Sequence, residues 1–172
     1  MTLEQAQDKA RNNFKSGMNC AQSVFAVFAE ELGMNLETAL KVSQGFGGGM
    51  CRMREVCGCV SAMIMASSLV TGSADPSDKN AKDECYKTGQ KLSQKFREKN
   101  GSVVCRELLG LVPMGQSETA LQNKTPVEHK VESSVSSERT EEYYKKRPCD
   151  QLVQDAVGVI EKVLFNEESQ ES

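Results

Sequence analysis

Apolar residues recur at helical spacing along most of this chain, and no segment alternates as a half-buried strand would. Residues that favour helix N-caps precede the expected helices at Thr2, Asn19, Asn35, Ser77 or Asp78, and Ser102. Pro148 occupies the usual first position of a last helix. The pattern therefore predicts an all-α fold, an irregular multi-helix bundle of six or seven helices.

The stretch from Gln44 to Met65 organises the rest of the chain. Its four glycines, at positions 45 and 47–49, allow close backbone approach and positive φ, which predicts a tight bend. From Glu55 to Val70 apolar residues then surround the helix on every side, which is typical of a buried helix. We expect this segment to be the central helix of the bundle.

One polar segment interrupts the helical pattern. Residues 114–147 are rich in Gln, Ser, Glu, Lys and Thr and lack helical periodicity, so we expect a mobile surface segment or a lid there, and the composition favours disorder. The tail 166–172 is expected to be disordered. The chain as a whole, residues 1–172, has the length of a single domain.

Composition narrows the class of protein. The formal net charge of −3 does not favour nucleic-acid binding, and no apolar run approaches the roughly 18 residues of a membrane span. The N-terminal MTLEQAQDKARNNF lacks the apolar core of a signal peptide. Seven cysteines without a secretory signal indicate a cytoplasmic protein with thiol or metal chemistry rather than a disulfide framework.

Four cysteines fall in the first turn of four different expected helices: Cys20, Cys57, Cys105 and Cys149. Helix N-termini carry partial positive charge and free N–H groups, which stabilise a thiolate. We therefore expect these four sulfurs to converge on one site. Cys85, in the middle of a polar helix, is expected to lie apart from them.

Two further thiols are secondary candidates. Cys51 lies in the glycine bend. Cys59 is about 200° around a helix from Cys57, so the two are not expected to face the same point. The neighbouring charges Arg52, Arg54 and Glu55 are interpreted as ordinary surface charges.

Several common sites are excluded by spacing. The chain has no C-x-x-C, which argues against a thioredoxin-type dithiol or a zinc ribbon, and no C-x-x-C-H for covalent haem. The glycine cluster lacks a following Lys-Ser/Thr and is not a P-loop. The only histidine, His129, lies in the polar segment and is expected to be solvated.

At its cysteines the chain resembles the redox-active C_GCAxxG_C_C family. The four widely spaced cysteines of that pattern match NCAQSVFAVFAEELG at Cys20, CGCVSA at Cys57, CRELLG at Cys105 and CDQLVQDA at Cys149. The stretch SQGFGGGM matches too, and together these cover most of residues 15–165. Cys59 replaces the alanine of the pattern and Ala62 its final glycine. The resemblance implies redox chemistry, and the helical domain is similar to that of split-Soret cytochromes, where cysteines accompany an iron–sulfur centre. The haem-binding part has no counterpart here, so no haem is expected.

Three functions remain open, and we order them as follows. The first is an iron–sulfur cluster or other thiolate-ligated metal, held by Cys20, Cys57, Cys105 and Cys149 for electron transfer with a redox partner protein or for redox sensing. Structural zinc is a variant, although the paired spacing typical of zinc sites is missing. The second is a thiol–disulfide oxidoreductase in which Cys57 is the nucleophile and Cys20 or Cys59 resolves. The third is a helical binding module whose cysteines are core residues.

Overall fold

The computed structural model describes residues 1–126 and 132–166. Within those ranges the protein is all-α, with nine helices and no strand, which confirms the predicted fold class. The helices are α1 (Leu3–Lys15), α2 (Cys20–Phe28), α3 (Leu36–Gln44), α4 (Gly58–Thr71), α5 (Lys79–Asn100), α6 (Cys105–Leu108), α7 (Gln116–Asn123), α8 (Glu141–Lys146) and α9 (Cys149–Ile160). A π-helical turn, Glu161–Asn166, follows α9.

The first helices begin where the capping residues predict. Thr2 and Asn19 each form a reciprocal capping box with the residue three positions later. Asn35 accepts a hydrogen bond from Thr38 N–H and caps α3. Asp78 does the same for α5, which ends at Gly101 in the left-handed conformation. These starts are set locally, which is why the sequence places them well.

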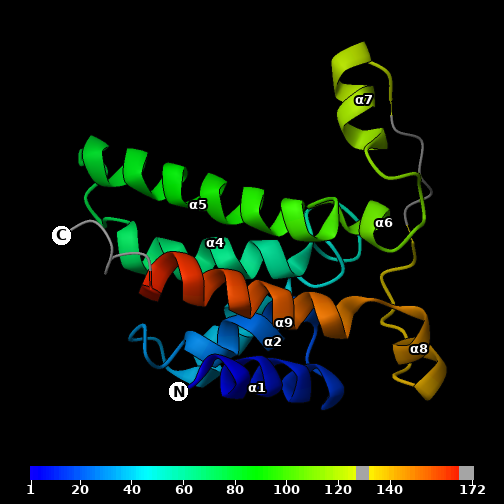
Figure 1. Cartoon of the computed structure of the whole chain (residues 1–172), viewed down its shortest axis with the longest axis horizontal. Coiled ribbons are helices and arrows are strands. Elements are labelled where there is room, and N and C mark those ends of the chain that lie inside the picture. The colour runs from blue at the N-terminus through cyan, green and yellow to red at the C-terminus, as the bar shows by residue number, and fades with distance from the viewer. Residues whose placement is uncertain (127–131, 167–172) are drawn as a thin grey trace.

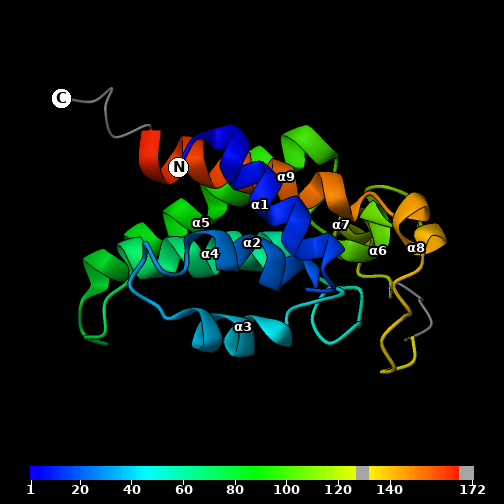
Figure 2. The ribbon, with the colours of Figure 1, turned by 90° about the horizontal axis from the view of Figure 1, so that it is seen from below.

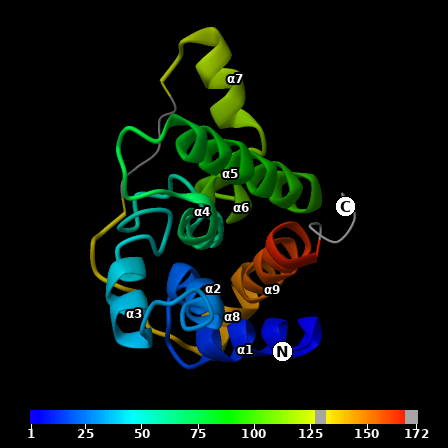
Figure 3. The same cartoon turned by 90° about the vertical axis from the view of Figure 1, so that its left-hand side faces the viewer.

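The bundle is built around α2 and α4, which pack against each other. Helix α1 covers α2 on one side, α5 covers α4 on the other, and α9 contacts all four (Figures 1 and 3). Helix α3 lies on the outside of α2 (Figure 2). The largest fully buried side chains form the core: Phe14, Phe25, Phe28, Phe96, Met63, Leu92 and Ile160.

Helix α4 begins at Gly58, three residues later than the start expected at Glu55. Its first ten residues hold the buried positions, whereas Leu69 and Val70 near its end are exposed. The later start has a backbone cause, because Val56 pairs with Val104 in an isolated bridge and Cys57 has a non-helical ψ of 134°, with its N–H bonded to Val103 O.

The polar segment 114–147 contains two short helices that its composition did not predict. Helix α7 projects away from the bundle beyond α5, and α8 lies at the end where α9 begins (Figures 1 and 3). The mobility expected of this segment stays a prediction. His129 and the tail beyond Asn166 lie outside the described residues. Among the described helices, none has the length and apolar character needed to cross a bilayer.

Candidate functional site

Four helix starts carry the four cysteines singled out by sequence. Cys20, Cys105 and Cys149 are the first residues of α2, α6 and α9, and Cys57 is the N-cap of α4. The starts of α9 and α4 lie at the end of the bundle that also holds α6 and α8 (Figure 1). Each thiol is therefore close to the free N–H groups of a helix N-terminus.

These cysteines line one cavity of about 470 Å³. Six of the seven cysteines contribute to its wall, and they are Cys20, Cys51, Cys57, Cys59, Cys105 and Cys149. All seven cysteines are free thiols. Cys85 lies elsewhere, in a groove between α4 and α5. The structure thus brings the four principal candidates and both secondary ones together and leaves Cys85 outside.

The glycine bend is a run of left-handed backbone. Its residues are Gly48, Gly49, Met50, Cys51 and Arg52, with φ of 66°, 68°, 60°, 47° and 63°. Arg54 follows with φ of 60°. Left-handed conformation costs about 1–2 kcal/mol for each residue with a side chain, and such strain is typically held at functional sites. Hydrogen bonds from Arg54 N–H to Gly48 O and from Glu55 N–H to Gly49 O close the bend.

Two glycines let backbone approach the thiols. A Cβ on Gly58 would lie 2.5 Å from Cys20 Sγ, and one on Gly49 would lie 2.6 Å from Cys105 Cβ. Neither distance is compatible with a side chain, so these positions require glycine for close approach. The Gly-rich sequence therefore shapes the wall of the thiol cavity.

Cys20 is the thiol most strongly disposed to ionise. A hydrogen bond from the Cys59 thiol, with backbone N–H groups of Gly48 and Ala21, lowers the pKa of Cys20 from 9.0 to about 6 despite burial. The same hydrogen bond, together with one to Cys57, raises the pKa of Cys59 well above its ordinary value. Cys20 is thus held as a thiolate by a Cys59 thiol that stays protonated.

The expectation that Cys57 and Cys59 could not face the same point is wrong. It assumed that both lie on the helix, two residues apart at helical spacing. Cys57 is instead the N-cap, with φ −56° and ψ 134°, so its side chain is not bound to the helical period. Both thiols line the cavity, and the Cys20 and Cys57 thiols lie close enough to Cys59 to raise its pKa.

Cys105 and Cys149, two of the four helix-start cysteines, favour the protonated form. Burial, followed by repulsion from Cys57 and Cys20, raises the pKa of Cys105 to about 12. Burial, followed by repulsion from Cys20, Cys57 and Cys105, raises the pKa of Cys149 as well. The site cannot hold four thiolates without an additional source of positive charge.

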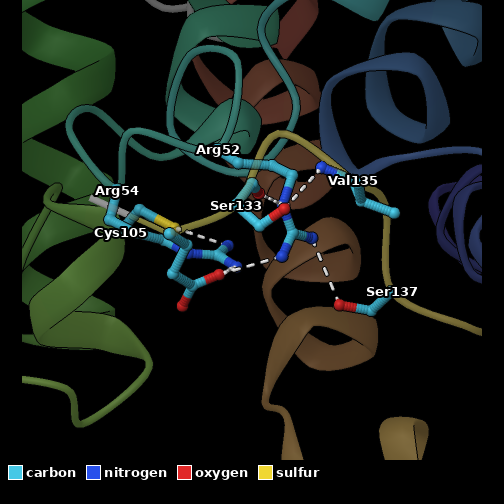
Figure 4. A network of polar contacts seen from close by, with 7 residues as sticks. Arg52, Arg54, Cys105, Ser133, Val135 and Ser137 are labelled. Carbon is cyan, nitrogen blue, oxygen red and sulfur yellow. Dashed lines mark hydrogen bonds and ion pairs between the residues drawn. The ribbon is translucent and has the colours of Figure 1, made fainter. Parts of the chain in front are cut away.

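Arg54 is not an ordinary surface charge, contrary to the interpretation from sequence. Its side chain is only 4% exposed, and its Nη1 lies 3.9 Å from Cys105 Sγ (Figure 4). Its Nη2 forms an ion pair with the Glu132 carboxylate. The hydrogen bond to Arg54 lowers the pKa of Glu132, which keeps this carboxylate charged. The left-handed backbone turns Arg54 inward, and helical periodicity cannot reveal that.

Arg52 binds residues 132–137 of the polar segment through three hydrogen bonds. Its guanidinium donates to Ser133 O at 2.8 Å, to Ser137 Oγ at 3.2 Å and to Glu132 at 3.0 Å (Figure 4). Sequence reasoning missed the arginines of this site. The available signal was local, because Arg52 and Arg54 lie between two cysteines directly after the glycine run.

The thiols of the cavity suit a polynuclear cluster better than a single metal ion. Within the described residues, no three Cys, His, Asp or Glu side chains are grouped to hold one metal ion. A tetrahedral zinc ion with ligands at about 2.3 Å needs sulfurs about 3.8 Å apart, so this arrangement does not fit mononuclear zinc. A polynuclear iron–sulfur cluster takes four separate cysteine thiolates, and thiols spaced around one cavity fit that requirement.

No curated protein and no solved structure matches the chain. One family model does match, over residues 18–163, and its description is "Putative redox-active protein (C_GCAxxG_C_C)". The match includes all four helix-start cysteines together with the glycine bend. The chain belongs to the C_GCAxxG_C_C family of redox-active proteins.

Proposed function

We propose that this protein binds an iron–sulfur cluster through Cys20, Cys57, Cys105 and Cys149 and uses it for electron transfer or redox sensing. The observation that carries the proposal is the placement of these four thiols, from four helix starts, around one cavity. Four thiolates from separate elements are the ligand set of such clusters. Cytoplasmic reducing conditions would keep the ligands available.

The surroundings of the sulfurs support this assignment. Gly48 and Ala21 donate backbone N–H groups to Cys20, and Arg54 donates to Cys105. Hydrogen bonds to cluster sulfurs are one of the levers that set reduction potential. The side chains of Leu108 and Leu152 contribute apolar wall, which limits water at the site. A bound cluster would supply one-electron transfer, and positive metal charge would relieve the repulsion that disfavours ionisation of Cys105 and Cys149.

Anaerobic isolation tests the proposal. We expect protein purified without oxygen to contain iron and acid-labile sulfide and to show the broad visible absorption of thiolate-ligated iron. Protein that is colourless and metal-free, and that fails to take up iron and sulfide on reconstitution, would contradict it.

A second function, thiol–disulfide exchange, is favoured by the hydrogen bond between Cys59 and Cys20. In this scheme the Cys20 thiolate attacks a substrate disulfide and forms a mixed disulfide, which releases one substrate thiol. Cys59 then loses its proton and attacks Cys20 Sγ, which forms the Cys20–Cys59 disulfide and releases the second substrate thiol. Two protein thiols are oxidised and one substrate disulfide is reduced. The lowered pKa of Cys20 makes it a better candidate for the attacking thiol than Cys57.

Disulfide mapping distinguishes this scheme from the first. Equilibration of metal-free protein with a dithiol–disulfide buffer should yield a Cys20–Cys59 bond, identified by mass spectrometry after digestion. A different bond, or none across the accessible potential range, would reject the scheme.

A further inference from the structure

The wall of the thiol cavity is strongly cationic. Four arginines line it, Arg52, Arg54, Arg139 and Arg147, and the described lining residues include no Asp, Glu or Lys. We propose that this cavity is a binding site for a small anionic ligand, a carboxylate or oxyanion compound, which the arginines hold against the thiols. The inference uses the same cavity as the proposed function but does not depend on a cluster.

The positive charge of the four guanidinium groups is only partly compensated by the Glu132 carboxylate and the Cys20 thiolate. Glu132 is the carboxylate partner of both Arg52 and Arg54. Within residues 1–126 and 132–166, no carboxylate forms an ion pair with Arg139 or Arg147, although Arg147 lies close enough to Glu132 to help lower the pKa of that carboxyl group. A cavity wall with more guanidinium than carboxylate groups attracts anions, and low-dielectric surroundings strengthen that attraction.

Among the cavity arginines, two buried guanidinium nitrogens have no acceptor within the part of the chain that the structure describes. They are Nε of Arg54 and Nη1 of Arg139. Arg54 as a residue is 3% exposed, and it lines the cavity. Leaving a buried donor unsatisfied costs about 1–3 kcal/mol, and more when it is charged, so an acceptor that reached these donors would stabilise the site. An oxyanion supplies acceptors of the required charge.

Aromatic rings fix the orientation of the other two guanidinium groups. Arg139 lies 4.9 Å from the ring centroid of Phe14 and 4.7 Å from that of Tyr143. Arg147 lies 4.6 Å from the ring centroid of Tyr143. These ring contacts use the faces of the guanidinium groups. Arg139 Nη2 donates to Met18 O at 3.3 Å, and the remaining N–H groups of the two arginines are left for a ligand. Ser134 and Ser136 add hydroxyl groups to the wall.

The cavity volume limits the ligand to a small molecule. About 470 Å³ is in the range of small-molecule sites. A guanidinium fork binds carboxylate and phosphate oxygens in the same bidentate geometry, so the shared chemistry is an oxyanion group. The ligand would then lie beside Cys20, whose half-buried thiol lines the same wall.

Two alkylating reagents of nearly equal size and different charge test the inference. Iodoacetate is anionic and iodoacetamide is neutral, and with either one the Cys20 thiolate displaces iodide and forms a carbon–sulfur bond. In reduced, metal-free protein, mass spectrometry would give both rates at Cys20 and at Cys85. We expect the iodoacetate-to-iodoacetamide rate ratio to be at least about threefold higher at Cys20 than at Cys85, because local potential concentrates the anion.

Arginine variants and a competing anion test whether the cavity arginines cause the raised rate ratio at Cys20. Arg139→Gln and Arg147→Gln should each lower the ratio at Cys20, whereas Arg97→Gln, in the groove that Cys85 also lines, should leave it unchanged. Inorganic phosphate should slow iodoacetate more than iodoacetamide at Cys20 of the unmodified protein, a measurement that remains decisive if the arginine variants fold poorly. Phosphate-insensitive rates with equal ratios at Cys20 and Cys85 would overturn the inference.

The result is separable from the proposed function. Protein that loads iron and sulfide but shows equal ratios rejects only the anion site. Protein that fails to load but retains a raised, arginine-dependent ratio rejects only the cluster.

Discussion

Two cavities of similar size flank helix α4 and differ in almost everything else. The thiol cavity has about 470 Å³ and the groove against α5 about 490 Å³. Six cysteines and four arginines line the first, whereas Cys85 and Arg97 are the only members of those types among the described residues lining the second. Volume therefore does not distinguish a candidate redox site in this protein.

The difference lies in what surrounds each thiol. Cys85 is in the middle of α5, where backbone N–H groups are used within the helix, and its Sγ is 3.5 Å from Ser68 Oγ. Cys20 starts a helix, receives N–H donors and a thiol, and lies against Gly58. Helix starts, close glycine contacts and buried arginines together separate the redox candidate from the ordinary cysteine.

A glycine-to-alanine substitution should destabilise the protein at the thiol cavity and stabilise it at the groove against α5. Gly58→Ala at the thiol cavity should destabilise the protein by about 1–3 kcal/mol, because its Cβ would meet Cys20 Sγ at 2.5 Å and Phe46 O at 2.8 Å. Chemical denaturation measures the free energy of unfolding. Unchanged stability in this variant would show that the close approach is not required.

The Cys59 thiol should control ionisation of Cys20. Since thiolate is the reactive form, the rate of Cys20 alkylation by iodoacetamide in metal-free protein should rise through a midpoint at about pH 6. Cys59→Ala removes the hydrogen bond that lowers the pKa, so the midpoint should move up toward 9.0. Cys59→Ser keeps a donor and should shift it less. Identical midpoints in all three proteins would exclude Cys59 as the cause.

At the groove, Gly89→Ala should stabilise the protein by about 0.5–1 kcal/mol. Gly89 is inside α5, and its added Cβ would meet Ile64 Cγ1 at an ordinary 3.8 Å, so the helix gains propensity without a clash. Thermal unfolding compared with Gly58→Ala gives the contrast in one experiment. Loss of stability here would mean that the α4–α5 contact is tighter than its geometry indicates.

The smallest effect is expected for Cys85→Ser. The replacement keeps a small side chain at a half-buried position whose recorded polar contact is the Ser68 hydroxyl. We expect a stability change within about 0.5 kcal/mol and no change in Cys20 alkylation. A change in Cys20 reactivity would link two regions that the comparison treats as independent.

The sequence predicted the helix starts, because these depend mainly on residues close together in the chain. Asn19 places Cys20 at the start of α2 through a capping box that needs only neighbouring residues. Cys105 and Cys149 also lie at helix starts as predicted, but the predicted caps are wrong: Val104 and not Ser102 is the N-cap of α6, and Pro148 is the N-cap of α9 rather than its first residue. Cys57 was expected three residues further into its helix than the structure has it, because the helix begins at Gly58 and not at Glu55.

The positions of the arginines and of the cavity-lining serines depend on contacts between segments that are distant in the sequence. Arg54 meets Cys105, 51 positions away, and Glu132, 78 positions away, and both contacts follow from a left-handed bend. Glycine-rich sequence permits such a bend but does not specify how residues after it turn. The polar composition of residues 114–147 suggested a lid as one of two interpretations, but it did not show that Ser134, Ser136 and Ser137 line the thiol cavity. Local periodicity does not reveal which other element a polar segment covers.

The central claim is that four helix-start cysteines form one metal-binding site, and the most direct test is iron and acid-labile sulfide per chain in single Cys→Ser variants. Cys20→Ser, Cys57→Ser, Cys105→Ser and Cys149→Ser should each lose most of both after anaerobic reconstitution. Cys59→Ser controls for general disturbance of the buried wall, and it should load like the unmodified protein, as should Cys85→Ser. Full loading of any of the first four variants, or loss of loading in Cys85→Ser, would contradict the claim.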